Sequence, residues 1–361
     1  MKRTQGIMLS HVPSMAGAGT SFLLHGDATL SLPVLLLIWI LVVGAIFGSF
    51  FNVVIYRLPL GLNLAHPPSR CPACEHPIRW RDNLPVLGWV LLRGRCRDCK
   101  SPISARYPLV EAVTGLLFAG LAWLEVLGPE SSLPHRPDPF AAVVALEWGV
   151  YGYHLWLACT LLIATLIEYD GHRVPPRLLL LAFVVGLGFP LIWPGLRPEP
   201  LFLVQDRAAW VVGLTEGLAG LAAGVLLGCL AWPSTALAGH RHNGGRDPAA
   251  GFRAMAELAL VGTFLGWQAV GTIAVGAGIL LLLAGAFLPL GSAAARAGWS
   301  GSITLTVLLY LAAWDNLVVW QPGFGPTANL LNLVYAGLTM AGVSLLAWRL
   351  GWRPESRLTS S

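Results

Sequence analysis

The sequence predicts an all-α polytopic membrane protein with eight or nine transmembrane helices and a small folded loop between the first two. Of its 361 residues, 55% are hydrophobic and only 11% are charged, and the mean hydropathy is +0.67. Soluble domains carry roughly 25% charged residues, and several apolar runs here reach the ~20 residues that cross a bilayer. Four cysteines in two Cys-x-x-Cys pairs lie between the first two apolar runs.

The apolar runs place the candidate spans along the chain. They lie near residues 33–56, 108–127, 145–168, 178–195, 209–232, 256–272, 274–291, 302–320 and 327–348. Because the stretch from 256 to 291 can hold one helix or two, the total is eight or nine. The chain is thus divided into an N-terminal segment (1–32), a first transmembrane helix (33–56), a loop (57–107), a polytopic membrane domain (108–350) and a basic tail (351–361).

The loop at 57–107 is strongly basic, with nine Lys or Arg residues against three acids. Short loops rich in Lys and Arg stay on the cytoplasmic side of a membrane. We therefore expect this loop and the basic tail to be cytoplasmic. A surface for nucleic acid or anionic lipid is the alternative explanation. Since orientation alone accounts for the charges, we expect membrane lipid and no nucleic acid among the partners.

The four cysteines of the loop have the spacing of zinc ligands. Two knuckles about twenty residues apart supply four thiolates for a tetrahedral site, and paired cysteines in a reducing compartment are more often metal ligands than disulfides. Four thiolates leave no open coordination position, so zinc would be structural. The ligands are Cys71, Cys74, Cys96 and Cys99. We expect Cys159 and Cys229 to be packing residues inside helices, and no internal repeat stands out.

The motifs around this loop carry a resemblance to a known family. Residues 48–59 read GSFFNVVIYRLP, 82–89 read DNLPVLGW, and 104–111 read SARYPLVE. Over residues 44–118 the chain resembles the type IV prepilin peptidases, also called leader peptidase/N-methyltransferases. Gly48 and Ser49 are small enough for close helix approach, and Asn52 is expected to hydrogen-bond to a neighbouring helix.

The resemblance implies a zinc-containing enzyme of the bacterial inner membrane. Such enzymes cut the short basic leader of type IV pilin or pseudopilin precursors at the cytoplasmic face. They then methylate the new N-terminus with S-adenosylmethionine. Peptide cleavage in this family uses two carboxylates on different helices, one to activate water and the other to donate a proton.

The first family aspartate is replaced in this chain. The family has Ile-Asp about seven residues before a proline, and here Glu168 occupies that place ahead of Pro175. Asp170 offers a second carboxylate nearby. The alternative is that both are acids at a helix end with no catalytic role. The same alternative holds for Glu111 at the start of the second span, where a negative charge is favoured near a helix N-terminus.

The second family aspartate is also replaced. The family motif Gly-x-Gly-Asp falls on residues 251–254, where Arg253 and Ala254 replace its last two residues. Glu257 lies about one helical turn further on, and Arg253 is too close to the interface to be its obvious partner. Glu168, Asp170 and Glu257 are therefore the catalytic candidates, with Glu168 and Glu257 as one possible acid pair.

Three functions remain open from the sequence. The first is an active prepilin peptidase that also transfers a methyl group. The second is a degenerate relative that binds pilin-like precursors or a membrane partner without proteolysis, or that retains only methyl transfer. The third is a transporter in which intramembrane acids relay protons. Those acids are Glu168, Glu216, Glu257 and Asp315.

Overall fold

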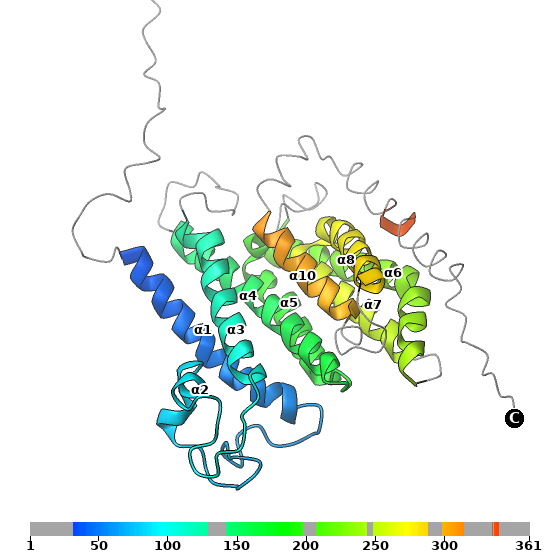
Figure 1. Ribbon diagram of the computed structural model, residues 1–361. Helices are drawn as coiled ribbons and strands as arrows, with labels where there is room; N and C mark the ends of the chain where they lie inside the picture. Colours follow the sequence, from blue (N-terminus) through cyan, green and yellow to red (C-terminus); the bar gives the residue numbers. More distant parts are fainter. Residues whose placement is uncertain are drawn as a thin grey trace, which may run out of the picture.

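The protein is a helical bundle with an irregular loop at one end (Figure 1). The computed structural model describes residues 32–128, 142–197, 207–243, 248–287, 298–313, 334 and 336–338. The helices are α1 (Leu32–Arg57), α2 (Leu87–Leu91), α3 (Arg106–Ala122), α4 (Ala142–Tyr169), α5 (Pro176–Ile192), α6 (Ala209–Asn243), α7 (Pro248–Leu265), α8 (Trp267–Phe287) and α10 (Gly298–Ala312). Short 3-10 helices are η1 (Trp80–Asn83) and η3 (Pro194–Leu196), and the π-helical segment η2 (Trp123–Leu127) continues α3.

The helices confirm the all-α membrane class. Four of them are long and apolar enough to cross a bilayer: Leu32–Arg57, Arg106–Leu127, Glu147–Tyr169 and Ala209–Ala231. Three shorter apolar helices accompany them: Pro176–Ile192, Trp267–Leu281 and Gly298–Ala312. The total of eight or nine spans stays a prediction. Asp315, the span at 327–348 and the tail belong to stretches that the structure leaves undescribed, apart from four residues near 336.

α1 and α3 form a closely packed pair at one side of the bundle (Figure 1). A Cβ atom on Gly48 would lie 2.7 Å from the Cα of Glu111, and one on Gly44 would lie 2.7 Å from the Cβ of Phe118. Asn52 Nδ2 donates to the Tyr107 carbonyl at 3.1 Å. Both expectations for this segment, the close approach at Gly48 and the interhelical bond of Asn52, are confirmed.

α6 and α7 approach even more closely, with backbone against backbone. A Cβ atom on Gly220 would lie 1.9 Å from the carbonyl oxygen of Gly262, and one on Gly224 would lie 2.3 Å from that of Leu258. Glycines along one helix face permit this distance inside a membrane. The contact fixes the position of α7, which carries Glu257.

The helical stretch after α6 divides at a different place from the one expected. The runs 256–272 and 274–291 predicted a break near residue 273, whereas α7 ends at Leu265 and α8 begins at Trp267. Gly266 between them has φ +81°. Left-handed backbone favours glycine, so the turn occurs there although the apolar composition continues on both sides.

A buried arginine connects three helices at the end of the bundle away from the loop. Arg197 is 5% exposed and donates hydrogen bonds of 2.5–2.8 Å to the carbonyls of Gly186 on α5, Gly213 on α6 and Thr263 on α7. The Gly186 carbonyl lacks its usual helical donor because residue 190 is proline. Thr263 lies in the last turn of α7, where carbonyls have no partner within the helix. The Tyr153 hydroxyl also donates to the Gly186 and Thr263 carbonyls, at 2.7 and 3.4 Å, so Arg197 and Tyr153 together satisfy these two carbonyls.

Candidate active site and metal centre

The four loop cysteines come together as the sequence predicts. Their Sγ atoms all lie within 4.8 Å of one another, and Cys71 Sγ is 3.8 Å from Cys99 Sγ. A tetrahedral zinc site with Zn–S bonds of about 2.3 Å places its sulfurs about 3.8 Å apart. The donor set and its dimensions fit a structural zinc ion.

The two knuckles have the same backbone conformation. In the first, the Cys71 N–H donates to the His76 carbonyl at 3.0 Å and the Glu75 N–H donates to the Cys71 carbonyl at 2.9 Å. The second repeats both bonds at equivalent positions, and each knuckle ends in an isolated β-bridge. Residues 70–77 (RCPACEHP) and 95–102 (RCRDCKSP) are therefore a short structural repeat. The sequence analysis missed it.

The thiols of the knuckles differ in acidity. Backbone hydrogen bonds from Cys74 and Ala73, with the Ser101 hydroxyl, lower the pKa of Cys71 to about 6. The Ser101 hydroxyl likewise lowers the pKa of Cys99. Although the backbone of His76 favours its thiolate, burial and the neighbouring thiols raise the pKa of Cys74 to about 12. Four thiolates at this spacing repel one another, so their joint ionisation requires a bound cation.

The loop is held against the helices by side chains at both of its ends. Glu111 on α3 accepts the Val86 N–H at 2.7 Å, so this carboxylate docks the start of α2. Trp89 Nε1 donates to the Ile103 carbonyl at 3.0 Å. Asp170, proposed as a second catalytic carboxylate, pairs at 2.7 Å with Arg106 at the start of α3. Asp170 thus connects the end of α4 to the loop.

Glu168 and Glu257 converge on one hydroxyl group. Ser300 Oγ on α10 lies 2.6 Å from Glu168 Oε2 and 2.6 Å from Glu257 Oε1. All three residues are buried, with Glu257 and Ser300 each 1% exposed. The two carboxylate oxygens are therefore no further apart than the sum of these two hydrogen bonds. Carboxyl groups this close share their protons as a pair.

The helical course of α7 explains how Glu257 reaches this position. Residues 251–254 lie inside α7, so residue 257 follows residue 254 by about one turn on the same side. Ala254 is fully buried and carries no polar group. The carboxylate of Glu257 consequently faces α4 and α10. From the sequence alone, its proximity to Glu168 was one of several possibilities.

Arg253 completes the cluster by forming an ion pair with Glu168. The sequence predicted only that Arg253 is not the obvious partner of Glu257, and its ion pair is with the other acid, Glu168. Its side chain is 23% exposed and reaches the carboxylate of Glu168, which is 8% exposed. The ion pair compensates the negative charge of Glu168 inside the bundle.

A second pair of side chains fixes the register of α4 against α10. Thr165 Oγ1 and Thr304 Oγ1 are 2.8 Å apart, beside the bond between Glu168 and Ser300. From the first pair to the second, the residue number rises on α4 and falls on α10, so the two helices run antiparallel. Motif reasoning missed Ser300. The available signal is the run of buried hydroxyl residues at 300, 302, 304 and 306 in an otherwise apolar helix.

The hydrogen-bond geometry fixes how many protons the cluster holds. A serine hydroxyl has one proton and can donate to one carboxylate at a time. For both 2.6 Å contacts to be hydrogen bonds, one carboxyl group must itself carry a proton and donate to Ser300. Arg253 forms its ion pair with Glu168, so Glu168 is the carboxyl group whose negative charge is compensated.

Comparisons with known proteins identify relatives of this chain. The family model described as Bacterial Peptidase A24 N-terminal domain matches residues 42–124. The chain is 38% identical to a prepilin leader peptidase/N-methyltransferase of Klebsiella pneumoniae over 234 residues, covering 63% of this chain and 84% of the relative. It is 34% identical to that of Aeromonas hydrophila over 269 residues, covering 68% and 77%.

A relative of the same name from Myxococcus xanthus is 44% identical over 115 residues, 31% of this chain and 34% of the relative. No solved structure matches the chain. The extent of the Klebsiella match, together with the motifs of the loop, decides the family. The chain belongs to the prepilin leader peptidase/N-methyltransferase family.

Proposed function

We propose that this protein removes the leader peptide from type IV pilin or pseudopilin precursors and methylates the new N-terminus, at the cytoplasmic face of the bacterial inner membrane. The names of its relatives support both activities. The observation that carries the proposal is the convergence of Glu168 and Glu257 on Ser300. Because Arg106 pairs with Asp170, two residues beyond Glu168, the acids lie at the end of the bundle that bears the cysteine loop.

In this proposal the two carboxyl groups divide the work of hydrolysis. Glu168, ionised beside Arg253, takes a proton from a water molecule as the water oxygen adds to the scissile carbonyl carbon. Glu257 donates its proton to the carbonyl oxygen. Collapse of the tetrahedral intermediate breaks the C–N bond. The proton held by Glu168 passes to the leaving amine, and one hydroxyl group of the intermediate returns a proton to Glu257 as the C=O bond forms again.

Ser300 has a positioning role. Glu168 is one methylene longer than the aspartate of the family motif, Glu257 lies one turn beyond the second motif position, and reaction rates depend steeply on placement. The two hydrogen bonds at the Ser300 hydroxyl, one donated and one accepted, restrict both side chains. Glu257 Oε2 is buried and has no hydrogen-bond partner among the described residues. That oxygen is available for water or for the substrate carbonyl.

Zinc and S-adenosylmethionine are the cofactors that the proposal requires. Cys71, Cys74, Cys96 and Cys99 would hold zinc, which supplies structural cross-linking of the loop when bound. S-adenosylmethionine would supply the methyl group for the second step. The loop is held to α3 and α4 by Glu111 and Asp170, so folding of the loop is coupled to the end of the bundle where the acids lie.

Co-expression with a pilin precursor tests the proteolytic step. The wild-type chain should convert the precursor to the shorter form, as seen by gel mobility and N-terminal mass spectrometry. Glu168→Gln and Glu257→Gln should each abolish conversion, because each removes one acid–base function. Asp170→Asn is the matched control, an acid on the same helix end that contacts Arg106, and it should retain conversion.

Two results would count against an active peptidase. Conversion by both glutamine variants at the wild-type level would remove the acid pair from the mechanism. A wild-type chain that leaves the precursor intact, while Arg253→Gly with Ala254→Asp restores cleavage, would identify a degenerate relative that binds without cutting.

A further inference from the structure

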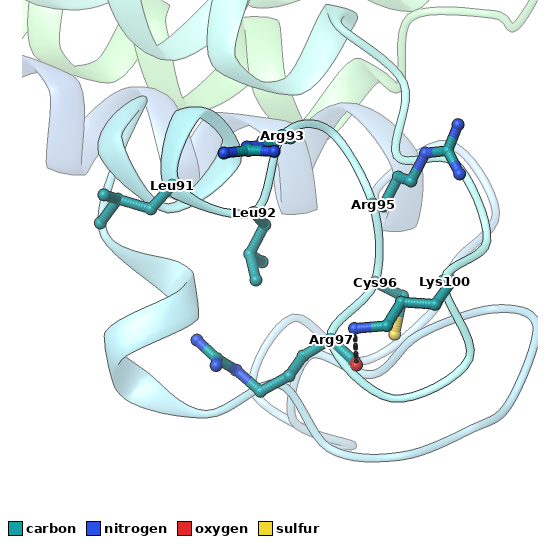
Figure 2. A pocket seen from close by; sticks show the side chains of 7 residues that line it. All are labelled: Leu91, Leu92, Arg93, Arg95, Cys96, Arg97 and Lys100. Carbon is teal, nitrogen blue, oxygen red and sulfur yellow. Dashed lines mark hydrogen bonds between the residues drawn. The ribbon is translucent and has the colours of Figure 1, made fainter.

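The cysteine loop has a basic hollow that the proposed peptidase does not use. Its volume is about 670 Å³. Two leucines, one zinc-ligand cysteine and four cationic side chains line it, and its lining contains no acid: Leu91, Leu92, Arg93, Arg95, Cys96, Arg97 and Lys100. In the view of Figure 2, Arg93 and Arg95 lie on the side nearer the long helices, and Arg97 and Lys100 lie on the far side.

Two of the four cations are already engaged. Arg97 donates to both oxygens of Asp82, at 2.8 and 2.5 Å. Lys100 Nζ donates to the Arg97 carbonyl at 2.8 Å, as Figure 2 shows. Within the described ranges, no hydrogen bond or ion pair engages the guanidinium groups of Arg93 and Arg95. These two arginines are therefore free to bind a ligand.

The negative charge of a zinc-bound cysteine cluster is smaller than the total positive charge of the four cationic side chains. Four thiolates around a zinc ion carry a formal charge of −2, which two neighbouring cations would balance. The hollow therefore retains an excess of positive charge. Arginine is suited to phosphate because its planar donors can contact two oxygens at once.

The depth of α2 places this hollow beside the bilayer. The Val86 N–H at the start of α2 donates to Glu111, which lies five residues after Arg106 in the apolar span Arg106–Leu127. At 1.5 Å per residue, this is about 7 Å along the helix axis from the start of the span. The start of α2 is therefore level with the first turns of a membrane-spanning helix.

The outward side of α2 is apolar. Leu87, Val90 and Leu91 are 60%, 55% and 73% exposed, and they share one side of the helix at spacings of three and four residues. The opposite side faces the protein, where Trp89 donates to the Ile103 carbonyl. Exposed apolar side chains beside unpaired arginines are typical of segments that lie in the membrane interface.

From these observations we propose that the hollow binds the phosphate headgroup of an anionic phospholipid, with Arg93 and Arg95 on the phosphate and Leu91 beside the acyl chain. A free phosphate ion would use the arginines but would gain nothing from Leu87, Val90 and Leu91. The lipid also belongs to the bilayer that surrounds α1 and α3. The inference depends on membrane insertion of the chain and is independent of the proposed peptidase activity.

Hydrogen–deuterium exchange of the full-length protein in nanodiscs tests where the lipid binds. Residues 87–97 should exchange more slowly in discs that contain phosphatidylglycerol than in discs of phosphatidylcholine. Equal exchange in the two kinds of disc would overturn the proposal. Equal protection by inorganic phosphate in phosphatidylcholine discs would also overturn it, since the site would then be one for free anions.

Native mass spectrometry with added phosphatidylglycerol tests which residues bind. Arg93→Gln with Arg95→Gln should weaken retention of the lipid roughly 30-fold, the effect expected for two arginines at an anionic surface. Arg79→Gln with Arg81→Gln is the matched control, because it removes the same charge from the same loop outside the hollow. An equal loss in the control would show attraction by net charge alone and would overturn the site. The zinc content of each variant shows whether its loop is folded. The nanodisc experiment compares two lipids with the wild-type chain, so its result does not depend on the folding of a variant.

Discussion

Glu168 on α4 and Glu257 on α7 lie on either side of a single hydroxyl group, with Ser300 Oγ 2.6 Å from an oxygen of each. The residues that meet there come from three helices, and none of the three is an aspartate. Arg253, one turn before Glu257, pairs with Glu168. The chain thus has a pair of carboxyl groups at the loop end of the bundle.

Ser300 is expected to matter for the rate of cleavage more than for substrate binding. Ser300→Ala removes both hydrogen bonds and should reduce kcat about 10- to 100-fold with little change in KM, because the carboxylates lose their relative placement. Ser302→Ala is the control, since that buried hydroxyl donates to the carbonyl of Gly298 in its own helix at 2.6 Å. Cleavage assays of purified protein with a pilin precursor measure both constants. Equal losses of kcat in the two variants would assign Ser300 a purely structural role.

Arg253 is expected to stabilise the folded bundle through its ion pair with Glu168. Arg253→Gln leaves Glu168 buried without its cation and should lower the free energy of unfolding by about 2 kcal/mol. This loss is smaller than that for a fully buried ion pair, because the arginine is partly exposed to solvent. Arg253→Lys should recover part of this loss. Thermal unfolding in detergent provides the measurement. Unchanged stability in Arg253→Gln would mean that the ion pair contributes nothing net.

The contact between α6 and α7 predicts that a single methyl group at Gly220 is harmful. Gly220→Ala would place its Cβ 1.9 Å from the Gly262 carbonyl oxygen, so α7 must move and carry Glu257 with it. We expect a loss of about 1–3 kcal/mol in stability and a strong fall in cleavage. Gly152→Ala on α4 is the control, because its Cβ would meet nothing within 4 Å. The prediction fails if both variants unfold and cleave alike.

The cysteine cluster predicts about one zinc ion per chain, measured by elemental analysis of protein purified without chelators. Cys71→Ser and Cys99→Ser should each lose the metal, because the coordination shell is left with three thiolates. Cys159→Ser and Cys229→Ser should keep it, since those cysteines lie on α4 and α6. Zinc retained after replacement of Cys99 would contradict the four-thiolate site.

The ion pair between Asp82 and Arg97 predicts a pH-dependent contribution to the folding of the loop. Hydrogen bonding from Arg97 lowers the pKa of Asp82. Since the folded pKa lies below the unfolded value of about 3.9, the pair stabilises the loop above that pH and loses this effect as the pH falls through the folded pKa. Asp82→Asn should therefore make the loop more sensitive to protease at pH 7, and the difference from wild type should shrink towards pH 3. A difference that is constant from pH 7 to pH 3 would exclude this linkage.

Local spacing in the sequence was enough to predict some of these features. The cysteine knuckles were predictable because their ligands are close in sequence, and the repeat RCPACEHP and RCRDCKSP could have been read from the same residues. Gly48 and Asn52 were also predictable, since the small residue and the polar residue lie on one apolar helix. Periodicity alone placed Glu257 one turn beyond Ala254.

The rest depended on packing between distant segments. Ser300 is more than forty residues from Glu257 and more than a hundred from Glu168, and nothing in its local sequence indicates which helix it faces. The direction of Arg253 depends on how α7 lies against α4. The break at Gly266 was missed because the apolar composition runs through it, and only the glycine marks the turn.

The three carbonyls bound by Arg197 have a mechanical consequence for the whole bundle. They join α5, α6 and α7 at the end away from the loop, where the Tyr153 hydroxyl also donates to two of the three carbonyls. Helices joined by hydrogen bonds at one end are least able to separate at that end. We therefore expect a precursor to enter by splaying the helices beside Glu168, with Arg197 as the pivot of that motion.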